Sequence, residues 1–440
     1  MTELDFFRGR YVLKENVPVD MRQLLKSSEI MQVPCMAIEH QTVQCQRCGV
    51  TERKEEVQVT AYPNHFYYCP SCLILGKVDS RQVFYHVVES DRRINRQVNF
   101  RWKGQLTKQQ QRVSKEVLRS YRKGQDHMIY AVTGAGKTEM LFPLVRQVLG
   151  EGKRIAIASP RVDVCLELYP RFQEVFPDET IALLHGNQTE PYTYSPFVIC
   201  TTHQLLRFKA SFDIVVVDEV DAFPYKGNEM LIYGMEKATK PKGSHVFLTA
   251  TPDKKELEKG RKGELGISQA FQRYHGYPLP VPKSLYMPRI SRWQSKGNIP
   301  RKLTKILRQD NKKYLIFFPN IEMMMVYYHQ LKKAYPNKKM SYVYASSKGR
   351  EERVYGMREG RWDWLLTTTI LERGVTFTNV HVIVMQAEHR VFNTASLIQI
   401  AGRVGRKKEY PTGEVYYCYE VQSRSMKESI RKIKEMNHRD

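Results

Sequence analysis

Residues 131–138, AVTGAGKT, have the glycine spacing of a loop that binds phosphate. They follow the apolar run HMIYA and precede LFPLVRQVLGEG, which has the pattern of a helix. Gly134 and Gly136 let the backbone curl so that its N–H groups face an anion at the positive end of that helix. In this pattern Lys137 would reach the β- and γ-phosphates of a nucleotide, and the Thr138 hydroxyl would bind Mg²⁺. The strict pattern begins with glycine, where this chain has alanine, and a chance glycine-rich turn is the alternative.

A pair of acids ends the apolar run FDIVVV further along the chain. Asp218 would hold the magnesium ion, through water, and Glu219 would orient and deprotonate an attacking water molecule. Thr249 and Thr251 close the next apolar run, where their hydroxyls could hydrogen-bond the acid cluster. An acid pair after a strand is weak evidence alone, but together with the phosphate loop it predicts the metal site of a nucleoside triphosphatase.

A glutamine-rich segment, LTKQQQ, precedes the phosphate loop. Gln110, close to Leu106 and Thr107, could place its amide against the edge of an adenine. The alternative is the solvated start of a helix, because the segment offers three glutamines. The predicted nucleotide-binding residues are therefore Gln110, Gly134, Ala135, Gly136, Lys137 and Thr138.

Two arginines lie in the sequence QIAGRVGR, at a spacing that would place both on one face of a helix. Planar guanidinium groups suit phosphate oxygens and can stabilise charge that develops on a γ-phosphate. Because Arg403 and Arg406 are far along the chain from the phosphate loop, a nucleotide would bind between two lobes and pull them together. A basic helix face is the alternative. The predicted catalytic residues are Lys137, Asp218, Glu219, Gln399, Arg403 and Arg406.

Four of the eight cysteines form two close pairs, Cys45 with Cys48 and Cys69 with Cys72. Paired cysteines in a chain that stays inside the cell indicate a metal rather than disulfides. Two such knuckles can meet around one tetrahedral Zn²⁺ ion. A closed shell of four thiolates leaves no position for water, so we expect a structural zinc.

Hydroxyl-bearing or basic residues follow several other apolar runs. Such residues can grip a sugar–phosphate chain without reading its sequence, although each could also be an ordinary strand end. The predicted nucleic-acid-binding residues are Pro160, Arg161, Thr202, His203, Thr368, Thr369, Arg373 and Gly374. A second candidate stretch interleaves cations, which track phosphates, with aromatic rings, which stack on bases. It comprises Tyr286, Arg289, Arg292, Trp293 and Lys296, and a solvated linker is the alternative.

Short apolar runs alternate with helical segments from about residue 100 onward. This alternation predicts a parallel sheet covered on both faces, with functional loops at the carboxyl ends of its strands. The pattern stops in a stretch rich in Lys, Gly and Pro and then restarts, which predicts a second lobe of the α/β class. The predicted domains are 1–95 (zinc-binding), 96–255 (first lobe), 256–299 (linker) and 300–440 (second lobe).

The charge balance is strongly basic, with 70 Lys and Arg against 46 Asp and Glu, a formal net charge of +24. This excess favours a polyanionic partner, nucleic acid first and an anionic membrane surface second, although an evenly spread excess could serve solubility alone. No run approaches the ~18–20 apolar residues that span a bilayer, and the N-terminus lacks a signal-peptide pattern. We expect a cytoplasmic protein that reaches the inner face of the membrane only through partners.

Taken together, the motifs resemble those of helicase superfamily 2 motors. They occur in the usual order between residues 106 and 406: TGAGKT, SPR, TTH, DEVD, TAT, LLTTTILERG and QIAGRVGR. The resemblance implies two tandem RecA-like lobes and ATP hydrolysis, and the DEVD sequence separates the chain from DEAD-box RNA helicases proper. DEVDAFPY, the preceding four-cysteine domain and the length are similar to the ComFA proteins, late-competence ATPases of Gram-positive bacteria.

The ComFA resemblance implies a single-stranded DNA (ssDNA)-dependent ATPase that drives incoming DNA across the membrane during natural transformation. It also implies two partners, the phosphoribosyltransferase-like competence protein ComFC and the membrane DNA channel. Two alternatives stay open. One is a replication-restart or repair helicase, although the restart helicases carry their zinc-binding cysteines inside the motor. The other is a zinc-scaffolded nucleic-acid or protein binding module with a regulatory ATPase, against which the complete set of predicted catalytic residues argues.

Overall fold

The computed structural model describes residues 2–60, 65–90, 94–186, 192–288, 290, 299–308 and 312–438. The chain divides into two compact units. The first comprises Met1–Ile129 and Thr138–Ser268, and the second comprises Tyr130–Lys137 and Gln269–Asp440. Within the described ranges, no helix is both long and apolar enough to cross a bilayer.

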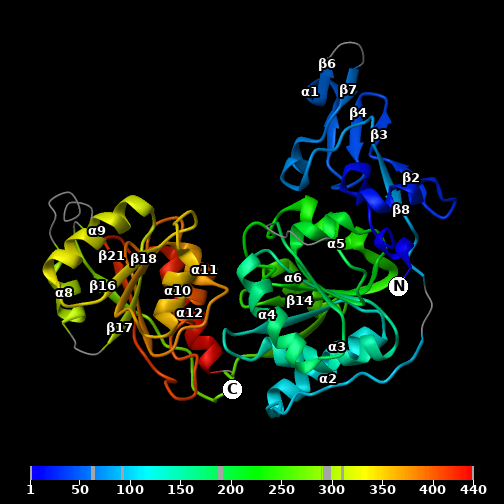
Figure 1. The fold of residues 1–440 in the computed structure, drawn as a ribbon. Helices are drawn as coiled ribbons and strands as arrows, with labels where there is room; N and C mark the ends of the chain where they lie inside the picture. The colour runs from blue at the N-terminus through cyan, green and yellow to red at the C-terminus, as the bar shows by residue number, and fades with distance from the viewer. Residues whose placement is uncertain are drawn as a thin grey trace. The chain divides into compact units, whose positions relative to one another are not determined.

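The first sheet has seven strands in the order β11-β12-β10-β13-β14-β9-β15. Figure 1 labels β14 of this sheet together with the helices α2 to α6. The strands are β9 (His127–Ala131), β10 (Ile155–Ser159), β11 (Ile181–Leu184), β12 (Phe197–Thr201), β13 (Phe212–Asp218), β14 (Thr239–Thr249) and β15 (Gly266–Ala270). The pairs β11–β12, β12–β10, β10–β13 and β13–β14 are parallel. Every residue of β10 and of β12 is buried, as expected for a parallel strand covered on both faces.

Helices connect the strands of this sheet. They are α2 (Lys108–Arg122), α3 (Lys137–Gly150), α4 (Val162–Val175), α5 (Glu229–Ala238), α6 (Lys254–Arg261) and the 3₁₀ helix η5 (Thr202–Arg207). Side chains cap the start of three of them, because the first backbone N–H groups of a helix have no partner inside it. Thr107 caps α2, Asn228 caps α5 and Asp253 caps α6.

The second sheet has six strands in the order β16-β21-β20-β17-β19-β18, and all neighbouring pairs are parallel. The strands are β16 (Lys283–Tyr286), β17 (Lys313–Phe317), β18 (Met340–Val343), β19 (Trp364–Thr367), β20 (Val380–Val384) and β21 (Val415–Tyr419). Its helices are α8 (Arg301–Leu307), α9 (Ile321–Ala334), α10 (Arg350–Arg358), α11 (Thr394–Ala401), α12 (Arg424–Asn437) and the short η6 (Thr369–Glu372). Its core packs around the fully buried Trp364 and Tyr314.

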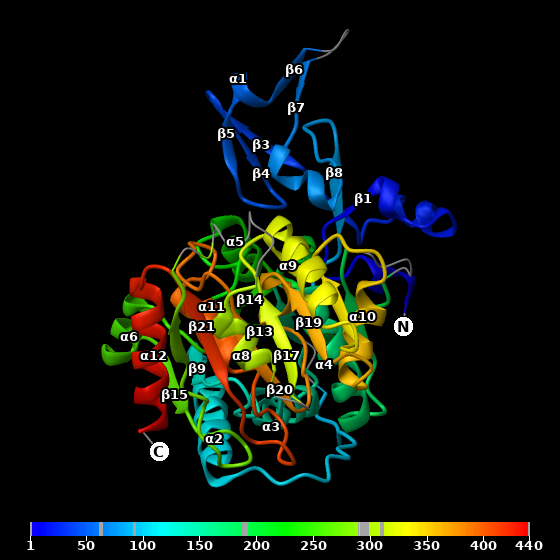
Figure 2. The same ribbon diagram turned by 90° about the vertical axis from the view of Figure 1, so that its left-hand side faces the viewer.

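The N-terminal region is built from much shorter elements (Figure 2). Its strands are β1 (Val12–Leu13), β2 (Met31–Pro34), β3 (Met36–Glu39), β4 (Thr42–Cys45), β5 (Thr51–Arg53), β6 (Gln58–Thr60), β7 (His65–Tyr67) and β8 (Val83–His86). Its helical turns are η1 (Glu3–Phe6), η2 (Lys14–Asn16), η3 (Val19–Lys26), α1 (Lys54–Val57) and η4 (Pro70–Leu75). The strands pair antiparallel in small sheets of two or three.

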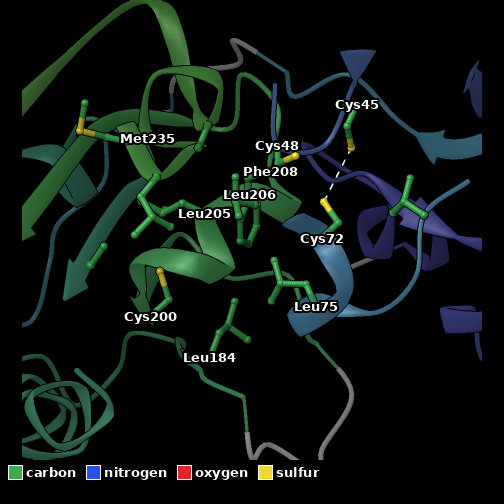
Figure 3. Packing of buried hydrophobic residues seen from close by; sticks show 14 of the residues in the cluster. Cys45, Cys48, Cys72, Leu75, Leu184, Cys200, Leu205, Leu206, Phe208 and Met235 are labelled. Carbon is green, nitrogen blue, oxygen red and sulfur yellow. Dashed lines mark hydrogen bonds between the residues drawn. The ribbon is translucent and has the colours of Figure 1, made fainter. Parts of the chain in front are cut away.

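One hydrophobic core joins the N-terminal region to the first sheet (Figure 3). Cys48 and Leu75 of the N-terminal region belong to the same buried cluster as Leu205, Leu206 and Phe208. Strands of two to four residues bury too little surface to be stable by themselves. The N-terminal region therefore completes its core with side chains of the first sheet and its helices.

The prediction of two parallel-sheet α/β lobes behind a small four-cysteine domain is confirmed. The stretch 256–299, predicted as a linker, contributes strand β15 to the first sheet and strand β16 to the second. Of the basic and aromatic stretch within it, Tyr286 lies in β16 and is half-exposed. Arg289, Arg292, Trp293 and Lys296 lie outside the described residues.

Candidate nucleotide, nucleic-acid and metal sites

The phosphate-loop segment turns from strand β9 into helix α3. Gly134 and Gly136 have φ angles of 88° and 77°, in the left-handed region that favours glycine. Lys137 is the first residue of the 14-residue helix α3, at the end where backbone N–H groups point out of the helix. The segment therefore has the local geometry of an anion-binding helix start, with Thr138 in the first turn.

The acids lie directly after strand β13. Asp218 is the last residue of the strand, and its Oδ1 accepts a hydrogen bond from the backbone N–H of Glu219 at 2.8 Å. Glu219 has a φ of 58°, which is uncommon for a residue with a side chain and costs about 1–3 kcal/mol. Such strain is typical of positions whose side chain must point in one direction. The predicted contact between a hydroxyl and the acid cluster is confirmed at Thr251, whose Oγ1 donates to Oδ2 of Asp221, the last acid of the DEVD sequence, at 2.8 Å.

Arg171 of α4 is a basic neighbour of the phosphate-loop helix that the sequence analysis missed. Its Nη1 donates to Oγ1 of Thr138 at 3.2 Å, and its Nη2 donates to Oε1 of Glu139 at 2.5 Å. The hydroxyl predicted to bind Mg²⁺ is therefore held by an arginine. No local sequence pattern marks Arg171, because the two helices meet only through the fold.

Gln110 is buried at the start of α2 and forms a capping box with Thr107. Oε1 of Gln110 accepts a hydrogen bond from the backbone N–H of Thr107 at 2.9 Å. The backbone N–H of Gln110 donates to the Thr107 hydroxyl at 3.3 Å. The side-chain amide is thus fixed in direction by the helix cap.

The predicted nucleic-acid residues of the first unit follow two neighbouring strands. Pro160 and Arg161 come directly after β10 and are half-buried. Thr202 and His203 open η5 directly after β12, and Thr202 is fully buried. Burial lowers the pKa of His203, which favours its neutral ring.

In the second unit, Arg403 lies in a turn just beyond α11, which ends at Ala401, and Arg406 directly follows that turn. The prediction that both lie on one face of a helix was wrong, because the chain leaves the helix before them and Gly405 takes a φ of 69°. Nε of Arg403 donates to the carbonyl of Glu372 at 3.0 Å, and Nη1 of Arg406 donates to Oγ1 of Thr376 at 3.2 Å.

Gln399 lies inside α11 and is buried. Its Oε1 accepts a hydrogen bond from Oγ1 of Thr133 at 2.9 Å, and both residues belong to the second unit. Side chains of the phosphate-loop segment and of the arginine motif are therefore in contact within that unit.

The remaining predicted nucleic-acid residues follow strand β19. Thr368 precedes η6, which begins at Thr369, and both are half-buried. Arg373 is almost fully buried, and its Nε lies 3.6 Å from Oε1 of Glu372. Gly374 has a φ of 73°, so the backbone turns there in a conformation that glycine adopts without strain.

The four paired cysteines come together as a buried cluster. Figure 3 labels three of them, Cys45, Cys48 and Cys72. All four Sγ atoms lie within 4.8 Å of one another, with 3.7 Å between Cys45 and Cys72 and 3.5 Å between Cys48 and Cys69. Four thiolates around a tetrahedral zinc ion, at about 2.3 Å each, would be roughly 3.8 Å apart. The cluster therefore fits a four-thiolate zinc site.

Two basic side chains surround this cluster. Arg47 donates from Nε to Sγ of Cys72 at 3.2 Å and from Nη2 to the Cys72 carbonyl at 3.0 Å. Lys237 of α5 donates from Nζ to the carbonyls of Arg47 at 2.5 Å and Leu206 at 2.8 Å. Burial lowers the pKa of Lys237 to about 7, whereas negative charge on the sulfur atoms of Cys45 and Cys72 acts in the opposite direction. Lys237 thus links the segment between Cys45 and Cys48 to helix η5.

Three family models match successive parts of the chain. Residues 2–86 match the Competence protein ComFA N-terminal domain, residues 107–259 the DEAD/DEAH box helicase family, and residues 298–408 the Helicase conserved C-terminal domain. The helicase matches imply ATP and Mg²⁺ as ligands.

Solved structures with a similar fold are helicases. S. cerevisiae Dbp5 bound to RNA and ADP BeF3 has a TM-score of 0.57 at 18% identity, over 76% of this chain and 88% of that chain. RecG bound to a three-way DNA junction has a TM-score of 0.54 at 18% identity, over 77% of this chain and 46% of that chain. The two parallel-sheet lobes are therefore RecA-like.

Two curated relatives match nearly the whole chain. Competence protein ComFA of Streptococcus pneumoniae is 39% identical over 437 residues, which cover 99% of this chain and 98% of that protein. Competence protein ComFA of Bacillus subtilis is 34% identical over 436 residues, which cover 98% and 94%. ATP-dependent DNA helicase RecG of Aquifex aeolicus is 25% identical over 76% of this chain and 44% of its own length. The chain belongs to the ComFA family of competence proteins and is an ATP-hydrolysing, helicase-like enzyme of superfamily 2.

Proposed function

We propose that this protein is an ATPase stimulated by ssDNA, which translocates along that strand and drives DNA uptake in natural transformation. The proposal rests on membership of a competence family and on the residues at the ends of the strands. We propose ssDNA as the substrate because the family resemblance implies that DNA enters the cell as a single strand during natural transformation.

The observation that carries the proposal is the order in which the strands that precede the predicted functional loops neighbour one another in the first sheet. Strands β9, β14 and β13 are adjacent in the sheet and are followed by the phosphate loop, by Thr251 and by the acid pair. Strands β10 and β12 come next and are followed by Pro160 and by Thr202. Because β13 pairs directly with β10, a change at the acid pair after β13 can reach the residues after β10 that are proposed to contact DNA.

The proposed nucleotide chemistry divides among the predicted residues as follows. Lys137 contacts the terminal phosphates, while the Thr138 hydroxyl and Asp218 hold Mg²⁺, which neutralises developing charge when bound. Glu219 orients the attacking water and accepts its proton. Gln110 reads the adenine edge.

In the second lobe, Arg403 and Arg406 supply positive charge for the γ-phosphate, and Gln399 orients the arginine motif. Loss of the γ-phosphate removes what these cations bind, and the two lobes then separate. Chemistry at the phosphate is converted in this way into movement along the strand.

The proposed contacts with ssDNA are made to its sugar–phosphate backbone. In the first lobe they involve Pro160, Arg161, Thr202 and His203, and in the second lobe Thr368, Thr369, Arg373 and Gly374. Since Thr202 and Arg373 are buried, we assign their contribution to backbone N–H groups and loop shape rather than to exposed side chains.

The proposed metal of the N-terminal region is zinc, held by Cys45, Cys48, Cys69 and Cys72. Its role is structural, because four protein ligands complete the shell. The proposed partners are ComFC and the membrane DNA channel, which would bring the protein to the inner face of the membrane.

Steady-state ATP hydrolysis with and without ssDNA, duplex DNA and RNA tests this function. We expect strong stimulation by ssDNA, abolished by Lys137→Ala and by Glu219→Gln, with exposed Lys123→Ala as the matched control. Absence of stimulation by any nucleic acid would contradict the motor and favour the zinc-scaffolded binding module with a regulatory ATPase.

A replication-restart or repair helicase is the second candidate, and the similarity to RecG favours it. The chain spans less than half of that relative, so junction recognition does not carry over. A strand-displacement assay on forked duplex separates the two candidates: unwinding supports repair, whereas ssDNA-stimulated hydrolysis without unwinding supports translocation.

A further inference from the structure

Arg273 lies beside the phosphate-loop segment, in the loop that follows strand β15. The loop is held there by two backbone hydrogen bonds, from Val132 N–H to the Ala270 carbonyl at 3.0 Å and from Tyr274 N–H to the Gly134 carbonyl at 3.1 Å. Both ends of the β15 loop that carries Arg273 are therefore fixed against the phosphate-loop segment.

The side chain of Arg273 runs across the loop. A Cβ atom added at Gly134 would lie 3.6 Å from Cγ and 3.8 Å from Cδ of Arg273, so the arginine stem packs on the glycine face of the phosphate loop. The guanidinium group then reaches Gly405, whose carbonyl accepts a hydrogen bond from Nη1 at 2.7 Å. These residues all belong to the second unit.

The remaining donors of this guanidinium group are buried and unpaired. Arg273 is 1% exposed, and neither Nε nor Nη2 has a hydrogen-bond partner among the described residues. Burial lowers the pKa of Arg273 to about 9, and the charge of Arg406 acts in the same direction. A buried cation beside a second cation is unfavourable unless an anion is bound there.

Support of the Gly405 carbonyl does not account for an arginine at this position. Nε2 of His275 lies 2.9 Å from the same carbonyl oxygen, so that acceptor already has a second polar neighbour. A bracing role would use one N–H of Arg273 and leave Nε and Nη2 buried without function. Two donors on adjacent nitrogens of a planar group match two oxygens of a phosphate.

We propose that Arg273 is a further nucleotide-binding residue, which donates from Nε and Nη2 to the terminal phosphates of ATP held by residues 131–138. The inference rests on the assignment of those residues as the phosphate loop. Arg273, which lies along the chain between β15 and β16, would be a third arginine that contacts the phosphates, in addition to Arg403 and Arg406. Its ligand is the triphosphate, so Arg273 discriminates ATP from ADP.

Titration of full-length protein with fluorescent analogues of ATP and ADP tests this role. In Arg273→Ala we expect ATP affinity to fall about 10- to 100-fold, as for a lost charge-assisted contact, while ADP affinity falls much less. Arg273→Lys keeps the charge but not the planar fork, so it restores only part of the discrimination. Exposed Arg261→Ala on α6 is the matched control and leaves both affinities unchanged.

The outcomes separate this inference from its premise. If Lys137→Ala loses nucleotide binding but both Arg273 variants keep the wild-type ratio of ATP to ADP affinity, the role of Arg273 is wrong and the phosphate loop stands. Equal weakening of both nucleotides with a lower melting temperature would assign Arg273 to bracing Gly405 and overturn the inference. If Lys137→Ala binds nucleotide normally, the phosphate-loop assignment itself fails. If Arg273→Ala does not fold, Arg273→Lys carries the same comparison.

Discussion

The two lobes are both built on parallel sheets, yet the charges predicted to act on the nucleotide differ in sign between them. In the first sheet, β13 ends at Asp218 and is followed by the strained Glu219. In the second unit the corresponding charges are cations, Arg403 and Arg406, which lie beyond α11. Similar sheets can therefore serve as scaffolds for different chemistry, which is decided by a few residues after a strand in one lobe and after a helix in the other.

The two sets of charges are also held in different ways. The acids are positioned by backbone geometry close to their own strand, through the Asp218–Glu219 hydrogen bond and a left-handed residue. The arginines are positioned by distant parts of the chain, since Arg403 donates to Glu372 and Arg406 to Thr376. Substitution of an acid should therefore be a local change, whereas substitution of Arg403 should also disturb the fold of its lobe.

The largest expected effect is that of Arg406→Ala on turnover. Removal of a cation that stabilises the transferring phosphoryl group lowers kcat by about 10³-fold or more. Single-turnover ATP hydrolysis measures it, with exposed Arg261→Ala as the control. Turnover within twofold of wild type would mean that Arg406 contributes no charge to the reaction, and would contradict its place in the comparison between the lobes.

Glu219→Gln should have the next largest effect. Glutamine keeps the shape but cannot accept a proton, so turnover should fall about 10²- to 10³-fold with little change in ATP affinity. Stopped-flow hydrolysis and nucleotide titration separate the two quantities. Glu258→Gln, at an exposed position on α6, is the control. A loss of affinity equal to the loss of turnover would argue for a binding role of Glu219 instead.

Lys237→Met tests whether the N-terminal region is part of the first unit. The change leaves buried carbonyls of Arg47 and Leu206 without their donor, which should cost about 1–3 kcal/mol of unfolding free energy. Denaturant unfolding measures it, with exposed Lys242→Met as the control. Bound zinc, measured by release to a colorimetric chelator, should stay at one ion per chain. Unfolding in two separate steps for the wild type would show that the N-terminal region is independent of the sheet.

The smallest expected effect is an acid sensitivity of the first sheet that comes from His127. Its ring contacts Ser120 and Ser268 at 2.8 Å each, and burial lowers its pKa to about 4. The folded state therefore keeps the neutral ring while the unfolded chain takes up a proton near pH 6.5. Stability is fully present above pH 6.5 and is lost as the pH falls toward 4, by about 1–2 kcal/mol between pH 7 and 5.

Melting temperatures across this pH range check that prediction. His127→Gln should flatten the dependence between pH 7 and 5, whereas His438→Gln, at an exposed position, should leave it unchanged. An identical slope in His127→Gln and wild type would assign the acid sensitivity to other groups.

Much of this arrangement could be predicted from the sequence because the decisive signals are local. The loop around Gly134 and the acid pair each follow an apolar run that forms a strand, and the cysteine pairs predict one cluster. The end of α11 before Arg403 was missed, because helix-like spacing continued past the point where the chain turns. Arg171 and Lys237 were missed for a different reason, since their partners lie 33 and 190 residues away along the chain.

The shared core described above bears on the order in which the chain is made. Cys48 and Leu75 leave the ribosome before Leu205, Leu206 and Lys237 are synthesised. At ~5–20 residues per second, the gap between the N-terminal region and α5 corresponds to roughly 10 to 30 seconds. During this interval the N-terminal region has one apolar face exposed to solvent and to chaperones, although its cysteines are already available for metal. The part of the protein that is translated first is thus among the last to reach its final packing.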